Sequence, residues 1–456
     1  MKRQLLLALG CILLIAGWMS AFLMRAFPQQ SDFFFLVPAL LLGIGVGVTL
    51  KVLSAMRTSV VVILMAIVSV IAVNQVYPDG KISVTGFLQR MQNEVPKGKP
   101  VKIEVLESDR QGVFASDRTL NSMVDLRVQL FARIPGGGRM LAFDDAGRLY
   151  VTIPKLGAVY QLTDLNGDGF ADQSQLFHFD MDRPHGLVWD KDKLYIAETS
   201  RLLQLADKNK DNQVDEVNVV LDDLPDDGGH WTRSLAKGAD GFLYLSIGSR
   251  CNACEENDLR RATVMRVNPV TGETEIFAKG LRNSVGLTFS PDGKILWGSD
   301  NGRDMLGDDL PPDEINRLEK DGDYGWPYCY GNRIPDPDLG SMARCKETVS
   351  AAVELQAHSA PLGIAFGDGL KAPSTYQKSM FVAFHGSWNR SVPTGYKLIR
   401  IPFTNGQPEY AKEFLFGWFQ DGKAWGRPVA PVVGPDGSLY LSDDLADAIY
   451  RISWIE

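Results

Sequence analysis

Histidine and arginine residues recur at matching positions in six similar segments of the chain. Each stands just before a short apolar stretch, and together they are Arg139, His185, His230, Arg282 with Asn283, His358 and Arg427. Clustered arginine and imidazole groups focus positive potential and hold anions through charge-assisted hydrogen bonds. The pattern therefore predicts a site for an anion. The alternative is that these side chains pair with Glu198, Asp300 and Asp444 and only hold the fold together.

The segments that carry these residues are repeats of several short strands. Each has an apolar strand, a turn rich in Asp and Gly, a second strand of the type LYV and a third strand, as in GGGRMLAFDDAGRLYVTIPKLGAVYQL from Gly136. Six such repeats, spaced by roughly 45 to 80 residues, predict an all-β, six-bladed β-propeller over residues 101–456. The first strand of each blade would line the central channel, so the residues named above would ring one of its mouths.

The first 78 residues have a different composition. Three runs without a charged residue, 4–24, 33–50 and 58–76, are each about long enough to cross a bilayer as a helix. Lys2 and Arg3 precede the first run, and Lys51 and Arg57 lie between the second and third, so the positive-inside rule puts residues after 76 outside the cytoplasm. The sequence predicts three transmembrane helices in contact with membrane lipid over 1–78, and a polar linker over 79–100. The domain would face the periplasm from a bacterial inner (cytoplasmic) membrane.

Charge and cysteine content agree with that compartment. The chain has a net charge of −8, and residues 1–78 hold five Lys or Arg and one Asp, so the remainder carries −12. An acidic domain without basic runs argues against a nucleic-acid partner. Four of the five cysteines lie outside the apolar runs, which fits two disulfides in an oxidising compartment. The local pairing joins Cys251 to Cys254 and Cys329 to Cys345, and a redox-active C-x-x-C is the alternative for the first pair.

Two acidic loops space their oxygen-bearing side chains as calcium-binding loops do. The residues concerned are Asp164, Asn166, Asp168 and Asp172 in DLNGDGFAD, and Asp207, Asn209, Asp211 and Asp215 in DKNKDNQVD. Gln175 and Asn218 stand where such loops carry a bidentate glutamate. Weak structural calcium and plain solvated turns therefore both remain open for these loops.

From about residue 135 onward the chain resembles the quinoprotein sugar dehydrogenases, and among them the sorbosone dehydrogenase-like branch. The motifs that carry this resemblance are GLRNSVGLTFSPDG, DEINRLEKDGDYGWP, HSAPLGIAF, FHGSWNR and GPDGSLYLSDD. The resemblance implies a six-bladed propeller that oxidises a sugar, a polyol or a related aldehyde with pyrroloquinoline quinone (PQQ) and calcium. PQQ is a planar tricarboxylate, so a cationic site suits it. Electrons would pass to the respiratory chain through ubiquinone or a periplasmic acceptor.

The resemblance also implies roles for the residues that match its motifs. His230 would take the proton of the sugar hydroxyl, Arg282 would hold the quinone oxygen and Asn283 would accompany it. The further cofactor contacts expected are Arg139, His385, Arg390, Arg427 and Asp444. His185, one repeat before His230, is the rival base.

Calcium would bind at the cofactor through the backbone carbonyls of Gly302 and Arg303, and Glu314 and Tyr324 match ligands of further structural calcium. The chain also departs from the family pattern. Val285 and Val429 replace a glutamine and an arginine, and the segment from His385 to Arg390 stands where some members have a lysine.

Two other functions fit a six-bladed propeller. One is a calcium-dependent lactonase or related hydrolase, with a metal ion on the propeller axis. The other is a non-catalytic propeller that binds a glycan or a protein. Arginine and histidine residues at the axis favour an anionic organic cofactor over a bare cation, so the sequence favours the dehydrogenase.

Overall fold

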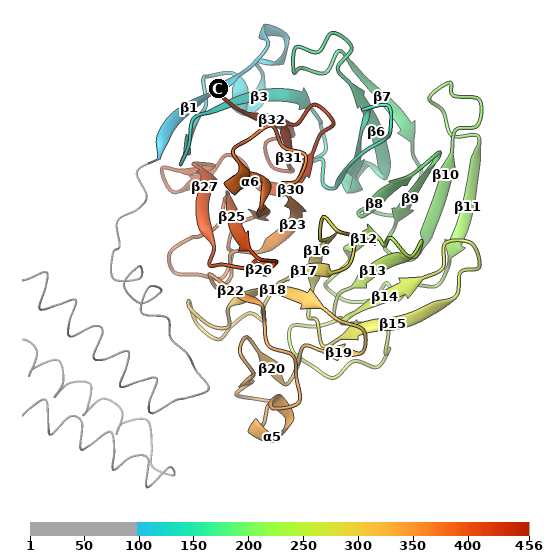
Figure 1. Ribbon diagram of the computed structural model, residues 1–456, viewed down its shortest axis with the longest axis vertical. Coiled ribbons are helices and arrows are strands. Elements are labelled where there is room, and N and C mark those ends of the chain that lie inside the picture. The colour runs from blue at the N-terminus through green and yellow to red at the C-terminus, as the bar shows by residue number, and fades with distance from the viewer. Residues whose placement is uncertain (1–97, 456) are drawn as a thin grey trace, which may run out of the picture. The chain divides into compact units, whose positions relative to one another are not determined.

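The computed structural model describes residues 98–455 (Figure 1). The three predicted transmembrane helices and nearly all of the predicted linker lie outside the described residues. Among residues 98–455, no helix has the length and apolar character needed to cross a bilayer. The chain divides into two units, residues 1–95 and 96–456. The first strand, β1 (Lys99–Glu104), takes the last two residues of the predicted linker.

Four separate sheets contain four or five strands each, and each sheet corresponds to one sequence repeat. The first two are β4 (Leu141–Phe143), β5 (Leu149–Ile153), β6 (Ala158–Thr163) and β7 (Gln173–His178), then β8 (Leu187–Asp190), β9 (Lys193–Ala197), β10 (Leu202–Ala206) and β11 (Glu216–Leu221). The next two are β12 (Arg233–Lys237), β13 (Leu243–Ile247), β14 (Thr263–Val267), β15 (Thr274–Lys279) and β19 (Gly322–Asp323), then β16 (Ser284–Phe289), β17 (Leu296–Asp300), β18 (Asp313–Leu318) and β22 (Val353–Leu355). Apart from the parallel pair of β15 and β19, their neighbouring strands are antiparallel.

The last two repeats share one eleven-stranded sheet, where the sequence predicted two separate ones. One part is β23 (Pro361–Phe366), β24 (Ser379–Phe384), β25 (Lys397–Thr404), β26 (Gln407–Pro408) and β27 (Lys412–Phe416), and the other is β30 (Pro428–Val433), β31 (Leu439–Asp443), β32 (Ala448–Trp454) and β3 (Leu126–Arg133). Strand β2 (Thr119–Ser122) and β1 join the two parts, because β2 pairs with β27 and β1 pairs with β3. Strand β3 also pairs with β32, so an early segment completes the last repeat.

The first strands of the six repeats lie side by side in a closed succession. Contacts run from β4 to β8, β12, β16, β23 and β30, and from β30 back to β4. Figure 1 shows the sheets arranged around the centre that these strands surround. The described residues therefore have an all-β, propeller-like fold. The arginine and histidine residues singled out in the sequence directly precede these inner strands.

Apolar side chains on neighbouring sheets pack against each other and form the core. Strand β5 is buried at all five positions, and Tyr150 in it stacks on Trp189 with ring centroids 5.0 Å apart. The turns between first and second strands need backbone conformations that glycine adopts without strain. In SPDG, Gly293 has a φ of 70°, and in GPDG, Gly437 has a φ of 79°. These turns set the register that places each inner strand.

Two insertions on the repeats carry disulfides, and both predicted pairings are confirmed. Cys251 is bonded to Cys254 in the loop between β13 and β14. Cys329 is bonded to Cys345 in the long connection between β18 and β22. This connection also contains β20 (Cys329–Tyr330), β21 (Ile334–Pro335) and α5 (Met342–Cys345), while α6 (Ser374–Gln377), β28 (Phe419–Gln420) and β29 (Lys423–Ala424) lie in the last two repeats.

Candidate active site

A polar cavity of about 170 Å³ lies where three of the inner strands begin. It is lined by His230, Arg282, Asn283, Asn301, Gly302, Asp304, Asp313, His358, Ala360, Trp388 and Asn389. The structure thus brings together the predicted base, the predicted quinone-holding arginine with its asparagine, and one predicted calcium carbonyl. Their neighbours Asn301, Asp304, Asp313, Trp388 and Asn389 were missed by the sequence reasoning.

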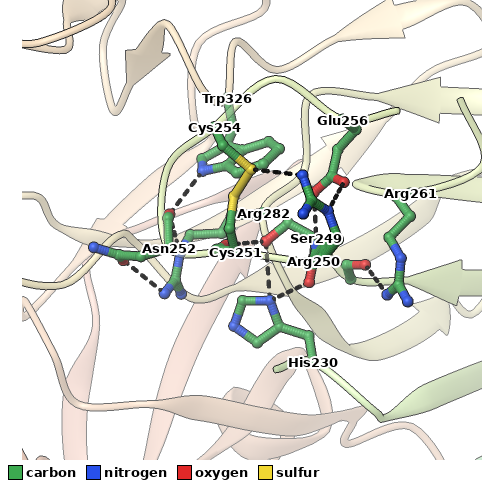
Figure 2. Close-up of a disulfide and its surroundings, with 11 residues drawn as sticks. His230, Ser249, Arg250, Cys251, Asn252, Cys254, Glu256, Arg261, Arg282 and Trp326 are labelled. Atoms are coloured by element: carbon green, nitrogen blue, oxygen red, sulfur yellow. Dashed lines mark hydrogen bonds and ion pairs between the residues drawn. A yellow bond between two sulfur atoms is a disulfide. The ribbon is translucent and has the colours of Figure 1, made fainter. Parts of the chain in front are cut away.

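His230 is held as a neutral imidazole with one ring nitrogen left for the cavity. Its Nδ1 lies 2.8 Å from the Ser249 carbonyl oxygen, which can only accept, so Nδ1 carries the proton (Figure 2). Burial, followed by the charge of Arg282, lowers the pKa of His230 to about 3. At neutral pH, Nε2 therefore has a free lone pair, as a general base requires.

The rival base, His185, has a different environment. Its side chain is fully buried, Nδ1 donates to the Arg233 carbonyl oxygen at 3.1 Å, and its ring packs edge-on against Trp231. Burial lowers its pKa well below the usual value. His185 is not among the residues that line the cavity, so the geometry favours His230.

Arg282 is fixed by four hydrogen bonds. Nε donates to the Asn252 carbonyl oxygen at 3.0 Å, and Nη1 donates to the Asn301 carbonyl oxygen at 3.2 Å. Nη2 donates to Asn252 Oδ1 and to Asp304 Oδ2, each at 3.0 Å. Because only 6% of its side chain is exposed, Arg282 presents a positive charge in one orientation.

Two side-chain amides in the cavity lining have unused hydrogen-bonding capacity. Among the described residues, the buried Oδ1 atoms of Asn283 and Asn389 have no hydrogen-bond partner. Asn389 Nδ2 donates to Asp304 Oδ1 at 3.0 Å. Gly248 allows Asn283 and His230 to pack directly against its backbone. A Cβ at this position would lie 2.6 Å from Asn283 Oδ1 and 2.7 Å from the His230 Cβ. Buried polar atoms without partners are uncommon, and these two oxygen atoms can accept hydrogen bonds from a ligand.

The other residues predicted to contact the cofactor form a second cluster, outside the cavity lining. Arg139 Nη1 lies 2.6 Å from Asp444 Oδ2, and His385 Nε2 lies 2.8 Å from Asp444 Oδ1. Arg427 donates to the His385 and Gly386 carbonyl oxygens at 3.0 and 2.9 Å. Burial by itself would raise the pKa of Asp444, but the hydrogen bonds from His385 and Arg139 hold it well below its usual range. For Asp444, this geometry agrees with the alternative interpretation of the sequence, in which the arginine and histidine residues pair with carboxylates and hold the fold together.

Arg390 also has partners of its own, which lie in two other segments of the chain. Its guanidinium donates to the Asp308 and Ala357 carbonyl oxygens and lies 3.3 Å from the Asp309 carboxylate. A role for Arg139, His385, Arg390, Arg427 or Asp444 in cofactor binding stays a prediction.

The four residues that the resemblance assigns to calcium line a smaller cavity of about 20 Å³ beside the first. Gly302 borders both cavities, while Arg303, Glu314 and Tyr324 border only the smaller one. Glu314 accepts hydrogen bonds from Gly331 N at 2.6 Å and Asn316 Nδ2 at 3.0 Å, and burial raises its pKa to about 8. The Tyr324 hydroxyl donates to the Arg317 carbonyl oxygen. Calcium at these residues stays a prediction.

The two acidic loops direct their carboxylates at their own backbones. Asp164 accepts from the amides of Gly167 and Gly169 at 2.7 and 2.9 Å, and Asp172 accepts from Leu165 at 2.7 Å. In the second loop, Asp207 and Asp215 accept from the corresponding backbone amides. In residues 98–455, the one group of three or more His, Cys, Asp or Glu residues close enough together to hold an ion is Cys251, Cys254 and Glu256. Its two sulfur atoms are bonded to each other. Calcium in the acidic loops stays a prediction.

Comparison with known proteins places the chain in a family. The family model described as TrAA12-like matches residues 125–454. The chain belongs to the TrAA12-like family. Its fold is similar to that of Trichoderma reesei carbohydrate-active enzymes family AA12, with a TM-score of 0.64 at 23% identity over 74% of this chain and 98% of that one. It is also similar to the holo form of the pyranose dehydrogenase PQQ domain from Coprinopsis cinerea, with a TM-score of 0.63 at 20% identity over 73% and 97% of the two chains. At these identities the likeness shows the fold.

Curated relatives of this TrAA12-like chain include sugar dehydrogenases. An uncharacterized protein of Borreliella burgdorferi is 39% identical over 216 residues, which are 46% of this chain and 56% of that protein. The aldose sugar dehydrogenase YliI of Escherichia coli is 24% identical over 53% of this chain and 65% of its own length. The PQQ-dependent pyranose dehydrogenase of Coprinopsis cinerea is 31% identical over 39% of this chain and 31% of its own length. The matches thus span less than two thirds of each of these relatives.

Proposed function

We propose that this chain is a quinoprotein oxidoreductase that oxidises a sugar, a polyol or a related aldehyde with PQQ. The observation that carries the proposal is the free Nε2 of a neutral His230 in the same cavity as the Arg282 guanidinium. The names of the relatives support it, since they describe an aldose sugar dehydrogenase and a PQQ-dependent pyranose dehydrogenase.

The residues of the cavity fit a planar tricarboxylate. Arg282 supplies a fixed positive charge for a carboxylate. The Oδ1 atoms of Asn283 and Asn389, which have no hydrogen-bond partner, can accept hydrogen bonds from the hydroxyl groups of a sugar or polyol. Ligand pockets commonly measure about 300 to 1,000 Å³, so a group of PQQ's size requires the rim of this cavity to open. Trp388, with 70% of its surface exposed, lies at that rim. Asp304 also lines the cavity, and a calcium ion at the carbonyls of Gly302 and Arg303 would offset its charge.

PQQ, when bound, supplies the acceptor for the hydride that leaves the carbon of the substrate. His230 Nε2 takes the proton of the substrate hydroxyl, while Ser249 keeps the other ring nitrogen protonated and the ring oriented. Arg282 stabilises negative charge that develops beside it, because Asp304 and Asn252 hold its guanidinium in place. Asn283 and Asn389 orient the bound groups.

Further parts of the proposal concern architecture and location. We infer six blades, with the eleven-stranded sheet counted as two blades joined through β1 and β2, and the ring of six inner strands supports this count. Residues 1–78 would anchor the domain in the inner membrane, facing the periplasm. Electrons would pass to ubiquinone or a periplasmic acceptor. The motifs quoted above support the sorbosone dehydrogenase-like branch.

The test is titration of the full-length protein with PQQ in calcium, followed by absorbance and by sugar-dependent reduction of a dye. The proposal expects a saturable spectral change and a rate that depends on PQQ, both lost with a chelator. His230→Gln is the matched control, because it should keep the spectral change and lose the rate. Absence of PQQ binding, or lactone hydrolysis without PQQ, would overturn the proposal.

A further inference from the structure

The Cys251–Cys254 disulfide closes a four-residue loop beside the cavity (Figure 2). Asn252 in this loop contacts Arg282 twice, because its carbonyl oxygen accepts from Arg282 Nε and its Oδ1 accepts from Nη2, each at 3.0 Å. The same Oδ1 accepts from Asp304 N at 2.7 Å, and Asn252 Nδ2 donates to the Asp304 carbonyl oxygen at 3.1 Å. Trp326 Nε1 donates to the Asn252 carbonyl oxygen at 3.2 Å. Asn252 therefore sets the position of both members of the Arg282–Asp304 ion pair.

The loop also reaches the opposite side of the cavity. The Cys251 carbonyl oxygen accepts from Ser249 Oγ at 2.7 Å, and Ser249 is fully buried. Ser249 in turn fixes the His230 ring through its carbonyl and hydroxyl oxygens, at 2.8 and 2.9 Å. The backbone amide of Ser249 donates to the Arg282 carbonyl oxygen at 2.7 Å. The expected base and the expected quinone-holding arginine are thus positioned by one short segment, residues 249–252.

We propose that the disulfide loop 251–254 is the positioning element of His230 and Arg282, and that reduction of Cys251–Cys254 by a dithiol lowers the activity of the site. In that reaction the S–S bond breaks, the two sulfur atoms gain two electrons and two protons, and the dithiol becomes a disulfide. The activity part rests on the proposed function, whereas the positioning part concerns only this chain.

The two disulfides differ in access to a reductant. Cys251 and Cys254 are half-buried, whereas Cys329 and Cys345 are 4% and 0% exposed. Arg250 Nη2 lies 3.9 Å from Cys254 Sγ, and a positive charge at that distance favours the thiolate and so the cleavage of the bond. Glu256, within 4.8 Å of both sulfur atoms, offsets part of that charge. The Cys251–Cys254 disulfide, which is the more accessible of the two, should therefore react first.

Reduction removes the covalent closure of the loop and leaves Asn252 held by hydrogen bonds alone. An open loop samples more conformations than a closed one. Misplacement of catalytic groups by about 1 Å can cost about 100-fold in rate. We expect the rate to fall roughly 10- to 100-fold when this disulfide opens.

The experiment treats the full-length protein with dithiothreitol and identifies the free thiols by alkylation and mass spectrometry. The first readout is the ¹H–¹³C ring signal of His230 without cofactor, assigned by its loss in His230→Gln. We expect this signal to move as Cys251 and Cys254 become free, while the signal of the distant His178 stays. The second readout is the PQQ-dependent dye reduction rate. If the protein shows no PQQ-dependent rate, the proposed function is wrong. The ring signal of His230 then tests by itself whether the disulfide loop positions this histidine.

Variants separate positioning from general damage. Cys251→Ser with Cys254→Ser should be slow from the start and indifferent to dithiothreitol. Asn252→Ala should move the His230 signal and slow the reaction, with an unfolding temperature near that of the wild type. Asn252→Asp, which keeps the acceptor oxygen for Arg282 and Asp304 N, should recover part of the rate. Gln407→Ala, at an exposed position of β26, is the control. Free thiols at Cys251 and Cys254 with an unmoved His230 signal, or a wild-type rate in Asn252→Ala, would overturn the proposal.

Discussion

Arg282 Nη2 lies 3.0 Å from Asp304 Oδ2, and this ion pair forms part of the cavity wall. The side chains are 6% and 21% exposed, so water screens the pair weakly. The same guanidinium therefore has two expected effects, because it holds the loop that carries Asp304 and presents a positive charge to the cavity where we propose that PQQ binds. Substitutions of Arg282 should therefore change both the stability of the fold and the affinity for PQQ.

Replacing Arg282 with Ala should weaken PQQ binding by about 1.5–3 kcal/mol, the usual effect of losing a charge-assisted hydrogen bond. Thermal unfolding should shift downward as well, because Asp304 loses its cationic partner. Fluorescence titration with PQQ and calcium measures the first effect and calorimetry the second. Wild-type affinity in a double Arg282→Ala, Arg427→Ala variant would contradict the cofactor site.

His230→Gln should bind PQQ, remain folded and reduce dye with sugar at least about 100-fold more slowly, because removal of a general base costs about 10²–10⁴ in rate. Single-turnover kinetics with loaded protein measure this step. His185→Gln is the matched control and should keep a rate near that of the wild type. A slow His185→Gln variant beside a His230→Gln variant of normal rate would show that His185 is the base.

The pH dependence of stability should reveal the neutral state of His230. Its folded pKa is about 3, whereas a histidine in an unfolded chain titrates near about 6.5. Between these values the unfolded chain binds the extra proton, so the free energy of unfolding rises with pH, by up to about 1.4 kcal/mol per pH unit. The stability contributed by burying neutral His230 is present above pH of about 6.5 and is lost as pH falls towards about 3. Denaturant unfolding between pH 4 and 7 should show a shallower slope for His230→Gln than for the wild type, and equal slopes would contradict the assignment.

The repeats made the strands around the axis predictable. Each repeat has the same apolar strand and Asp-Gly turn, so the residues before the inner strands could be aligned without a structure. This alignment is why His230, Arg282 and Asn283 were correctly predicted to lie together. The shared sheet could not be predicted in this way, because β1 and β2 lie outside the repeats and β2 pairs with β27, nearly 300 positions further along the chain.

Most of the other cavity residues lie in loops whose conformation depends on distant packing, and Asp313 begins β18. Asn252, which contacts Arg282, belongs to a C-x-x-C motif, in which the two cysteines are the residues that predict a disulfide. Asp304 follows Gly302 and Arg303, which were predicted to bind calcium, and Asn389 lies inside the motif FHGSWNR. Both residues are therefore close in sequence to predicted site residues. Their side chains meet because β17 and β24 bring the two loops to the same cavity, which no local pattern records.

Asp444→Asn should destabilise the fold, because Asp444 is the common partner of Arg139 and His385. Removing one member of a largely buried ion pair typically costs about 3 kcal/mol or more. Urea unfolding measures the loss. Asp125→Asn is the control, since the Asp125–Lys99 pair is 64% exposed on both sides and should contribute less than about 1 kcal/mol. Equal effects of the two substitutions would show that the Asp444 cluster does not stabilise the fold.

A reporter enzyme that works only in the cytoplasm should be silent when fused after residue 456, as the charge bias around the three apolar runs predicts. A reporter that works only in the periplasm should be active at the same point. Enzyme assays on intact cells compare the two fusions. Strong cytoplasmic activity would contradict the periplasmic location.

The pairing of β3 with β32 also governs when the domain can fold. Arg139 and Asp444 are 305 positions apart, and Gln129 and Arg451 are 322 apart, yet each pair is in contact. Because closing so long a loop loses much conformational entropy before any contact is gained, the last step should be slow and should wait for the final strand to leave the ribosome. Until then β30 and β31 have an unpaired edge, which is a site of aggregation. Shortening the chain by its last nine residues should therefore leave an insoluble protein rather than a smaller propeller.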